Sequence, residues 1–248
     1  MILAAAQINS FGIDTDANLE LHYEMTQRAA AKGARLIVFP EMSITGYVRE
    51  TAAQRAFSVD DARLSKLKNL ASEKHIVIVA GAPVLIGGDL FIGTFIIKPD
   101  QNVLLYTKQY LHRGEEVYFK SSFDYNPSIT LENECVYFAI CADTDEARHA
   151  QNAAQNGASI YIASICFSHE GLPSGYNTFS QYAKQHNMCV LMSNFCGQVY
   201  RYDCGGLSGF WDNTGLLVAG LNGSDAGLLV VEKNGKGWRG LMPAHSLS

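Results

Sequence analysis

The chain has 248 residues, of which 48% are hydrophobic and 17% charged, and its formal net charge is −5. The length allows a large buried core, and a charged share below the roughly 25% of average proteins mildly favours an oligomer. The acidic balance argues against nucleic acid or an anionic membrane surface as a partner. No apolar run approaches the ~18 residues of a membrane span, so we expect no membrane segment.

Several features of the sequence predict a cytoplasmic protein without a metal. The N-terminal "MILAAAQINSFG" has no basic leader and becomes polar too early for a signal peptide. The cysteines form no Cys-x-x-Cys pair, which is typical of reduced thiols in a reducing compartment. The histidines are scattered and form no cluster with cysteine, so we expect no zinc site.

The predicted elements of the first half alternate between strands and helices. Short apolar runs bounded by turn residues predict strands, and apolar residues at 3.6 spacing predict helices. In chain order they are a strand at 2–8, a helix at 15–32, a strand at 35–40, a helix at 60–74, strands at 75–86 and 90–100 joined through "GGD", and a strand from 103 onward.

The second half repeats this alternation after a stretch rich in loops. We expect a strand at 135–140, a helix at 144–156, a strand at 158–165, a helix at 174–187, a strand at 188–194, and strands with turns from 205 to 237. This order predicts one mixed α/β domain over residues 1–248, with helices packed on sheets.

Three reactive side chains follow apolar strands directly. Glu41 comes after "LIVFP", Lys108 after "VLLYT" and Cys141 after "VYFAI". Open α/β sheets usually build their sites at the C-terminal ends of strands. We therefore expect a carboxylate, an ammonium group and a thiol to meet in one cleft.

The chemistry of these groups is complementary. A thiol near its free pKa of about 8.5 is mostly protonated at neutral pH, and a buried Glu41 could accept its proton. Lys108 could stabilise an oxyanion. A helix capped by Asp143 or Thr144 would favour the thiolate of Cys141, which we expect to be exposed. Taken singly, the three residues could instead be a buried structural thiol, a carboxylate at a helix start and a solvated lysine.

The segments around these residues resemble the nitrilase superfamily, the carbon–nitrogen hydrolases. In order they are "LIVFPEMSITGY", "YTKQYLHRGEEVYF" and "FAICADTDEARHAQNAAQNGASIYIAS", and the later "AKQHNMCVLMSNFCG" and "GGLSGFWDNTGLLVAG" resemble the closing strands of the family. The resemblance spans nearly the whole chain. It implies a four-layer α-β-β-α sandwich of the nitrilase type.

The resemblance also implies a Glu-Lys-Cys triad. Cys141 would attack an amide, nitrile or carbamoyl carbon and form a thioester, and Glu41 would transfer the protons. Lys108 and the backbone N–H of Ala142 would hold the oxyanion. The implied protein needs no cofactor and no metal, acts on a small-molecule substrate, and pairs as a homodimer or a higher homo-oligomer.

Further site residues are less sharply indicated. The auxiliary glutamate of the family matches Glu115, seven residues after Lys108, although Glu116 stays open. A second group could line the pocket or bind a substrate carboxylate, with ordinary core or surface roles as the alternative: Tyr47, Phe167, Phe195, Arg148 and Arg201. We expect His149, eight residues after Cys141, to have no catalytic role.

One departure from the family narrows the expected activity. Ala142 stands where family members usually have an aromatic residue, and the Cys-Trp-Glu of true nitrilases is absent, which argues against nitriles. The sequence therefore predicts an amidase that releases ammonia or an amine from a small aliphatic amide or carbamoyl compound. The alternatives are an N-carbamoyl amine or amino-acid amidohydrolase, a catalytically idle member that binds a metabolite or partner, and a redox sensor that uses Cys141.

Overall fold

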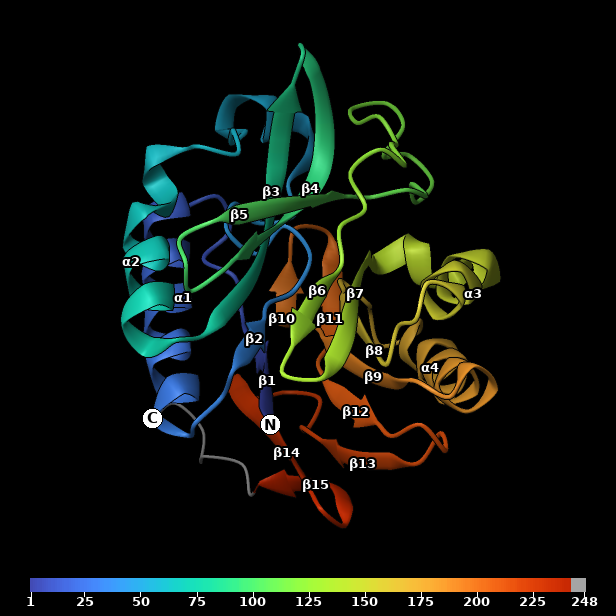
Figure 1. Ribbon diagram of the computed structural model, residues 1–248. Helices are drawn as coiled ribbons and strands as arrows, with labels where there is room; N and C mark the ends of the chain where they lie inside the picture. Colours follow the sequence, from blue (N-terminus) through green and yellow to red (C-terminus); the bar gives the residue numbers. More distant parts are fainter. Residues whose placement is uncertain (242–248) are drawn as a thin grey trace.

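The computed structural model describes residues 1–241, so residues 242–248 of the predicted domain lie outside the described chain. Two β-sheets lie face to face (Figure 1). Helices α1 (Thr15–Ala31) and α2 (Ser65–Lys74) cover one outer side, and α3 (Ala147–Gln155) and α4 (Leu172–His186) cover the other. This arrangement is the predicted α-β-β-α sandwich. None of the helices in residues 1–241 is long and apolar enough to cross a membrane.

The first sheet contains strands from both ends of the described chain. Its strands, in hydrogen-bonded order, are β15 (Gly237–Leu241), β14 (Gly227–Asn234), β1 (Ile2–Gln7), β2 (Leu36–Val38), β3 (Val77–Ile86), β4 (Asp89–Ile97) and β5 (Val103–Thr107). The three strands β1, β2 and β3 are parallel, and their crossovers contain α1 (Thr15–Ala31) and α2 (Ser65–Lys74). The remaining neighbours pair antiparallel.

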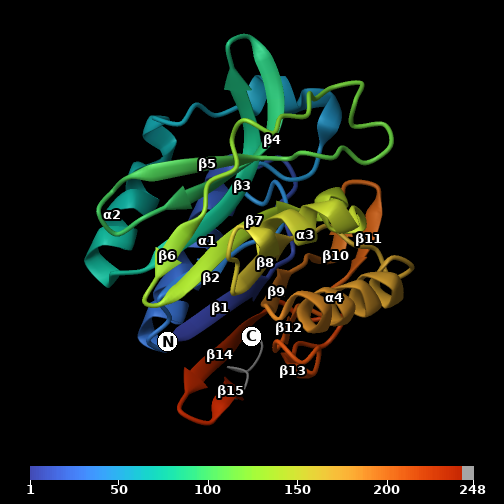
Figure 2. The same cartoon turned by 45° about the vertical axis from the view of Figure 1, so that its right-hand side comes forward.

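The second sheet has the same plan. Its strands, in order, are β13 (Leu217–Gly220), β12 (Gly209–Trp211), β9 (Cys189–Ser193), β8 (Ile160–Ser164), β7 (Glu134–Ile140) and β6 (Ile129–Leu131). Strands β7, β8 and β9 are parallel, and α3 (Ala147–Gln155) and α4 (Leu172–His186) form the crossovers. Figure 2 shows both helices over the outer face of this sheet. A separate hairpin pairs β10 (Cys196–Val199) with β11 (Tyr202–Gly205).

Small and apolar side chains bring the two sheets together. Residues 3–7 of β1, "LAAAQ", are all buried, and β2 is buried along its whole length, as expected for parallel strands covered on both faces. A hydrogen bond of 2.6 Å from Ser193 Oγ to the carbonyl oxygen of Ala6 links β9 to β1 across the interface. The carboxyl ends of β2 and β7 are thereby held at the same side of the molecule.

The sequence predicted most of these elements, with one error that matters for the site. The helix expected at 144–156 begins only at Ala147, because residues 141–145 form a 3₁₀ turn. The predicted cap by Asp143 or Thr144 is wrong: the N-cap residue of α3 is Glu146, and it makes no side-chain capping bond within the described chain. The short strand β6 and the hairpin of β10 and β11 were not predicted.

Candidate active site

Three strand ends from both sheets meet at one cleft. Glu41 lies in the turn after β2, Lys108 directly follows β5, and Cys141 directly follows β7. The cleft has a cavity volume of about 230 Å³, and its lining residues are Glu41, Tyr47, His112, Cys141, Asp145, Cys166, Phe167, Ser168, Gly171, Ser174, Gly175 and Tyr202. The expected meeting of these strand ends therefore occurs, but across two sheets and not along one.

Lys108 is fully buried between two carboxylates. Its Nζ lies 2.7 Å from Glu41 Oε1 and 2.8 Å from Glu115 Oε2, and neither glutamate is more than 1% exposed. Burial alone would lower the pKa of Lys108, but the negative charges of Glu41 and Glu115 outweigh it and raise the pKa above its ordinary value. Lys108 therefore stays protonated and separates the two carboxylates.

Glu41 is placed to act as a base. Burial raises its pKa to about 7; the ammonium of Lys108 opposes this shift and the charge of Glu115 adds to it. Its Oε2 atom is buried and has no hydrogen-bond partner among residues 1–241. A buried acceptor without a partner costs about 1–3 kcal/mol, and such an atom calls for a functional explanation. Here it is an acceptor available for a proton.

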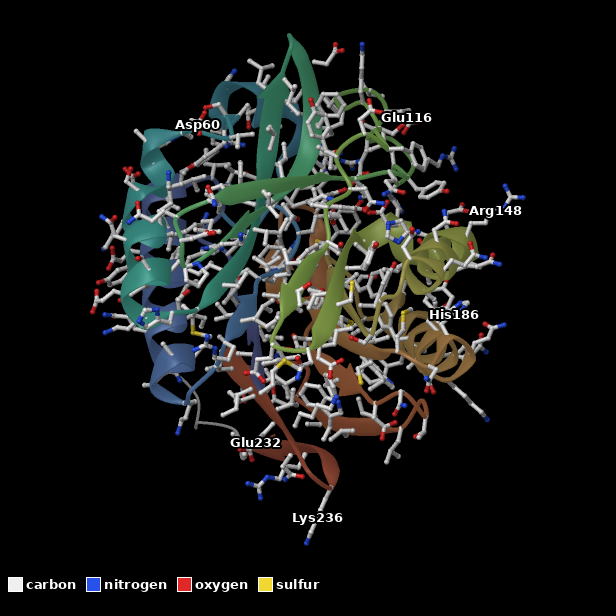
Figure 3. The ribbon with its side chains drawn as sticks, viewed as in Figure 1. Asp60, Glu116, Arg148, His186, Glu232 and Lys236 are labelled. Carbon is white, nitrogen blue, oxygen red and sulfur yellow. The ribbon has the colours of Figure 1, made fainter. Side chains whose placement is uncertain are left out.

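The structure places Glu115, not Glu116, beside Lys108. The Oε2 atom of Glu115 accepts a hydrogen bond of 2.7 Å from the backbone N–H of His112, and Oε1 accepts one from the hydroxyl of Tyr47. Burial raises the pKa of Tyr47, so this hydroxyl keeps its proton and donates. Glu116 is exposed on the loop, and Figure 3 shows it at the molecular surface.

Cys141 occupies a strained and buried position. Its φ of +42° lies in the left-handed region, where a residue other than glycine costs about 1–3 kcal/mol. The side chain is 8% exposed, and burial raises its pKa well above the ordinary value, with Glu41 adding to the shift and Lys108 opposing it. The expectation of an exposed thiol favoured as a thiolate is therefore wrong. This cysteine needs a base to become a nucleophile.

Asp143 clamps the turn that carries Cys141 to the segment that follows Lys108. Its carboxylate is fully buried. It accepts four hydrogen bonds, from the backbone N–H groups of Gln109 (2.9 Å), Tyr110 (2.8 Å) and Ile140 (2.8 Å) and from the hydroxyl of Tyr106 (2.6 Å). This residue was expected to cap a helix. It instead fixes two catalytic candidates relative to each other.

A buried histidine supports the turn that carries Glu41. His22 donates from Nδ1 to the carbonyl oxygen of Asn18 at 2.6 Å, so Nε2 accepts the hydroxyl of Ser43 at 2.8 Å. Burial lowers the pKa of His22 to about 4, with the Asn18 bond opposing the shift. His22 is therefore neutral at physiological pH.

Opposite pH dependences of folding stability follow for His22 and Glu41. The folded pKa of His22, about 4, lies below its unfolded value of about 6.5, so stability is lost as pH falls from 6.5 to 4, by roughly 3 kcal/mol. The folded pKa of Glu41, about 7, lies above its unfolded value of about 4.5, so its contribution is lost as pH rises through 7. In the wild type the two nearly cancel between pH 7.5 and 4.5.

Urea unfolding at pH 7.5 and 4.5 tests this balance. We expect Glu41→Gln to lose stability toward pH 4.5 more steeply than the wild type, because only the His22 contribution remains. The same substitution at the exposed Glu116 is the control and should keep the wild-type pH dependence. Equal slopes for Glu41→Gln and the wild type would contradict the shifted pKa of Glu41.

The other predicted residues divide between the cleft and the surface. Tyr47 and Phe167 line the cleft, and Ala142 is buried next to Cys141. Phe195 lies in the core away from the lining.

Arg148 is exposed and points away from the molecule on the outer side of α3 (Figure 3). Arg201 is also exposed and forms an ion pair of 3.1 Å with Glu50. The structure therefore brings neither predicted arginine to the cleft.

Sequence reasoning missed much of the cleft wall. His112, Asp145, Ser168 and Ser174 come from loops, a 3₁₀ turn and a helix end, which carry no hydrophobic periodicity, and Tyr202 begins β11, a strand that was not predicted. Asp145 had one available signal, its position at the end of the same short turn as Cys141. Within residues 1–241, no group of three or more His, Cys, Asp or Glu side chains is arranged to hold a metal ion.

Fold and site together define a class of protein, an α-β-β-α sandwich with a buried Glu-Lys-Glu group and a strained cysteine in one cleft. The chain belongs to the carbon–nitrogen hydrolase family, which residues 2–239 match. An arylacetonitrilase of Aspergillus kawachii is 28% identical over 119 residues, 43% of this chain and 36% of that protein. A nitrilase of Pyrococcus abyssi is 26% identical over 122 residues, 48% of this chain and 47% of that protein. The matched part thus spans less than half the length of these curated relatives.

Solved structures agree with the fold over almost the whole chain. An amidase from Nesterenkonia sp. AN1 superposes with a TM-score of 0.85 at 23% identity, covering 95% of this chain and 94% of that one. A mutant of that amidase in complex with butyramide gives 0.83 at 23% identity, covering 93% and 89%. In another mutant, acrylamide has added to the active-site cysteine, with a TM-score of 0.82 at 23% identity, covering 94% and 92%.

Proposed function

We propose that this protein is an amidase-type hydrolase that cleaves the C–N bond of a small aliphatic amide or carbamoyl compound through a thioester on Cys141. The observation that carries the proposal is the buried Oε2 of Glu41, which has no hydrogen-bond partner among residues 1–241, while Lys108 holds Oε1 beside the cleft that Cys141 also lines. A cavity of about 230 Å³ suits a small substrate, since pockets for drug-sized ligands measure roughly 300–1,000 Å³.

In the first half of the reaction, the thiol proton of Cys141 passes to Glu41 as the sulfur attacks the carbonyl carbon. The negative charge that develops on the carbonyl oxygen is stabilised by Lys108 Nζ and by the backbone N–H of Ala142. Glu41 then returns the proton to the leaving nitrogen. The C–N bond breaks, ammonia or an amine departs, and the acyl group remains on sulfur as a thioester.

Water completes the cycle in the second half. Glu41, again a carboxylate, takes a proton from a water molecule as its oxygen attacks the thioester carbon. The tetrahedral intermediate collapses with Cys141 as the leaving group, and the sulfur recovers the proton from Glu41. Lys108 keeps its charge throughout, because Glu115 remains paired with it at 2.8 Å while Glu41 is protonated.

The similar proteins support an amide substrate but leave nitriles to be tested. The Nesterenkonia amidase, whose structure is similar, was solved with butyramide and with acrylamide on its active-site cysteine. The curated relatives are nitrilases. The absence of the Cys-Trp-Glu of true nitrilases, where this chain has Cys141, Ala142 and Asp143, argues against nitriles.

An ammonia-release screen of aliphatic amides, N-carbamoyl amines, N-carbamoyl amino acids and nitriles tests the proposal. We expect the wild type to release ammonia from small amides and Cys141→Ala to be slower by at least roughly 10⁴-fold. Cys189→Ala, a buried cysteine on β9 outside the cleft, is the matched control and should stay active. Intact-mass measurement during turnover should find the acyl group on the wild type and on Cys189→Ala but not on Cys141→Ala.

The other outcomes distinguish the alternatives. Carbon dioxide released together with ammonia would identify a carbamoyl substrate. No ammonia from any compound, with a folded protein, would favour a metabolite-binding or partner-binding member. Assembly and location remain predictions: exposed apolar side chains on the loop before β6 (Val117, Tyr118, Phe123 and Tyr125) are the kind of surface that a second subunit covers and so favour a homo-oligomer.

A further inference from the structure

The charges of the cleft wall point to one kind of substrate. Of the described lining residues, Glu41 and Asp145 are the carboxylates, His112 is the one histidine, and none is lysine or arginine. Lys108 lies beneath the wall with no exposed surface, and Glu41 and Glu115 already pair with it. The space that a substrate enters is therefore bordered by negative charge that no lining lysine or arginine offsets.

Asp145 is the unpaired carboxylate of this wall. It ends the 3₁₀ turn that Cys141 begins, and the buried Asp143 anchors that turn. Burial raises the pKa of Asp145, and only the more distant charges of His112 and Lys108 oppose the shift, with no hydrogen bond to the carboxylate from residues 1–241. Asp145 is exposed to solvent at the cleft, so a cation or a hydrogen-bond donor brought by a ligand can reach this carboxylate and replace water there.

The arginines near the cleft do not reverse this charge. Arg148 and Arg201 are exposed and absent from the lining. Arg49 lies 5.7 Å from the ring centroid of Tyr47 and does not belong to the lining either. A substrate carboxylate would thus meet Asp145 without a cation to hold it.

We propose that Asp145 selects substrates that carry an ammonium group a few carbon atoms from the scissile carbon, that is, amino-alkyl amides or N-carbamoyl amines, over those that carry a carboxylate. This rests on the proposed function of Cys141. A 3₁₀ turn rises about 2 Å per residue, so the turn from Cys141 to Asp145 spans on the order of 8 Å. Tyr47, Phe167 and Tyr202 supply aromatic faces for the intervening methylene groups and for the cation.

Three amides of matched shape test the selection: 4-aminobutanamide, the neutral pentanamide and the anionic succinamate, each assayed at pH 8, where imidazoles as a class are neutral. We expect kcat/KM for 4-aminobutanamide to exceed that for pentanamide by roughly tenfold or more, and succinamate to be the poorest. Asp145→Asn should bring the ratio of the first two close to one. Glu146→Gln, the neighbouring carboxylate outside the lining, is the control and should keep the ratio.

A labelling experiment measures the effect of the Asp145 charge on reagents that enter the cleft, without any substrate. Aminoethyl, methyl and sulfonatoethyl methanethiosulfonate each transfer a thioalkyl group to a thiolate and release methanesulfinate, and peptide mass spectrometry resolves the rate at Cys141. The cationic reagent should react faster than the anionic one by roughly tenfold, and Asp145→Asn should reduce this ratio where Glu146→Gln does not.

The two readouts separate failure of the inference from failure of the function. Hydrolysis of pentanamide without a preference for the cation, or a preference that survives Asp145→Asn, overturns the role of Asp145 and leaves the amidase standing. If none of the amides is hydrolysed, the proposed amidase function is contradicted. The labelling rates at Cys141 then test by themselves whether the cleft favours a cation. Equal labelling by the cationic and anionic reagents overturns the inference.

Discussion

Replacing Glu41 by glutamine is expected to lower kcat/KM for amide hydrolysis by roughly 10²- to 10⁴-fold, the usual contribution of a general base. The reason is the raised pKa of Cys141, which is buried beside two glutamates and cannot ionise alone. For the wild type, kcat/KM should fall about tenfold per pH unit below pH 7, because burial raises the pKa of Glu41 to about 7. The apparent pKa belongs to the coupled group of Glu41, Lys108 and Glu115.

Initial rates from pH 5 to 9 measure both effects, and Glu41→Gln should lose the acidic limb together with the activity. Site-resolved alkylation of Cys141 by iodoacetamide over the same range gives a second reading without a substrate. Glu116→Gln, one residue from the buried Glu115, is the control and should keep the wild-type profile. An acidic limb that persists in Glu41→Gln would assign the base to another residue.

Asp143→Asn is expected to destabilise the fold by about 1–3 kcal/mol, the cost of leaving a buried donor without an acceptor. All four hydrogen bonds to this buried carboxylate come from donors, three backbone N–H groups and one hydroxyl. Asparagine replaces one carboxylate oxygen by an NH₂ group, which is itself a donor. The donors that faced this oxygen would then be buried without an acceptor. Chemical denaturation at pH 7.5 measures the loss, and it should be accompanied by loss of activity because the turn of Cys141 is no longer held.

Two further variants serve as comparisons for the stability of Asp143→Asn. Asp145→Asn makes the same chemical change two residues on, at a side chain with no hydrogen bond to it from the described chain, and should change stability by less than about 0.5 kcal/mol. Tyr106→Phe removes one donor at 2.6 Å and should cost about 1.5–3 kcal/mol. Equal stabilities for the two asparagine variants would show that Asp143 is no clamp.

The positions of Glu41, Lys108 and Cys141 could be predicted because they follow from local patterns, whereas the four-layer fold was expected from the resemblance to the carbon–nitrogen hydrolases. Each strand is a short apolar run, and each reactive residue comes at its end. The auxiliary glutamate could not be resolved, because Glu115 and Glu116 are adjacent in a loop and only the fold turns the first toward Lys108.

Contacts between segments far apart in the chain account for the remaining differences between the predicted and the observed site. The start of α3 depends on Asp143, whose partners Gln109 and Tyr110 lie more than thirty residues earlier in the chain. The pKa of Cys141 depends on burial by segments from both sheets, which no local pattern encodes. Wall residues from elements that were not predicted, such as Asp145 in the 3₁₀ turn and Tyr202 in β11, meet only after the chain has folded.

The pairing of β1 with β14 sets an order of events during synthesis. Ile2 lies opposite Glu232 and Gln7 opposite Gly227, so β1 leaves the ribosome long before the strand that borders it on one side. Until residues 227–234 emerge, an apolar strand keeps an open edge of unpaired N–H and C=O groups, which is a template for aggregation. A nascent chain stalled before residue 227 should therefore depend on chaperones, and one released with that segment complete should not.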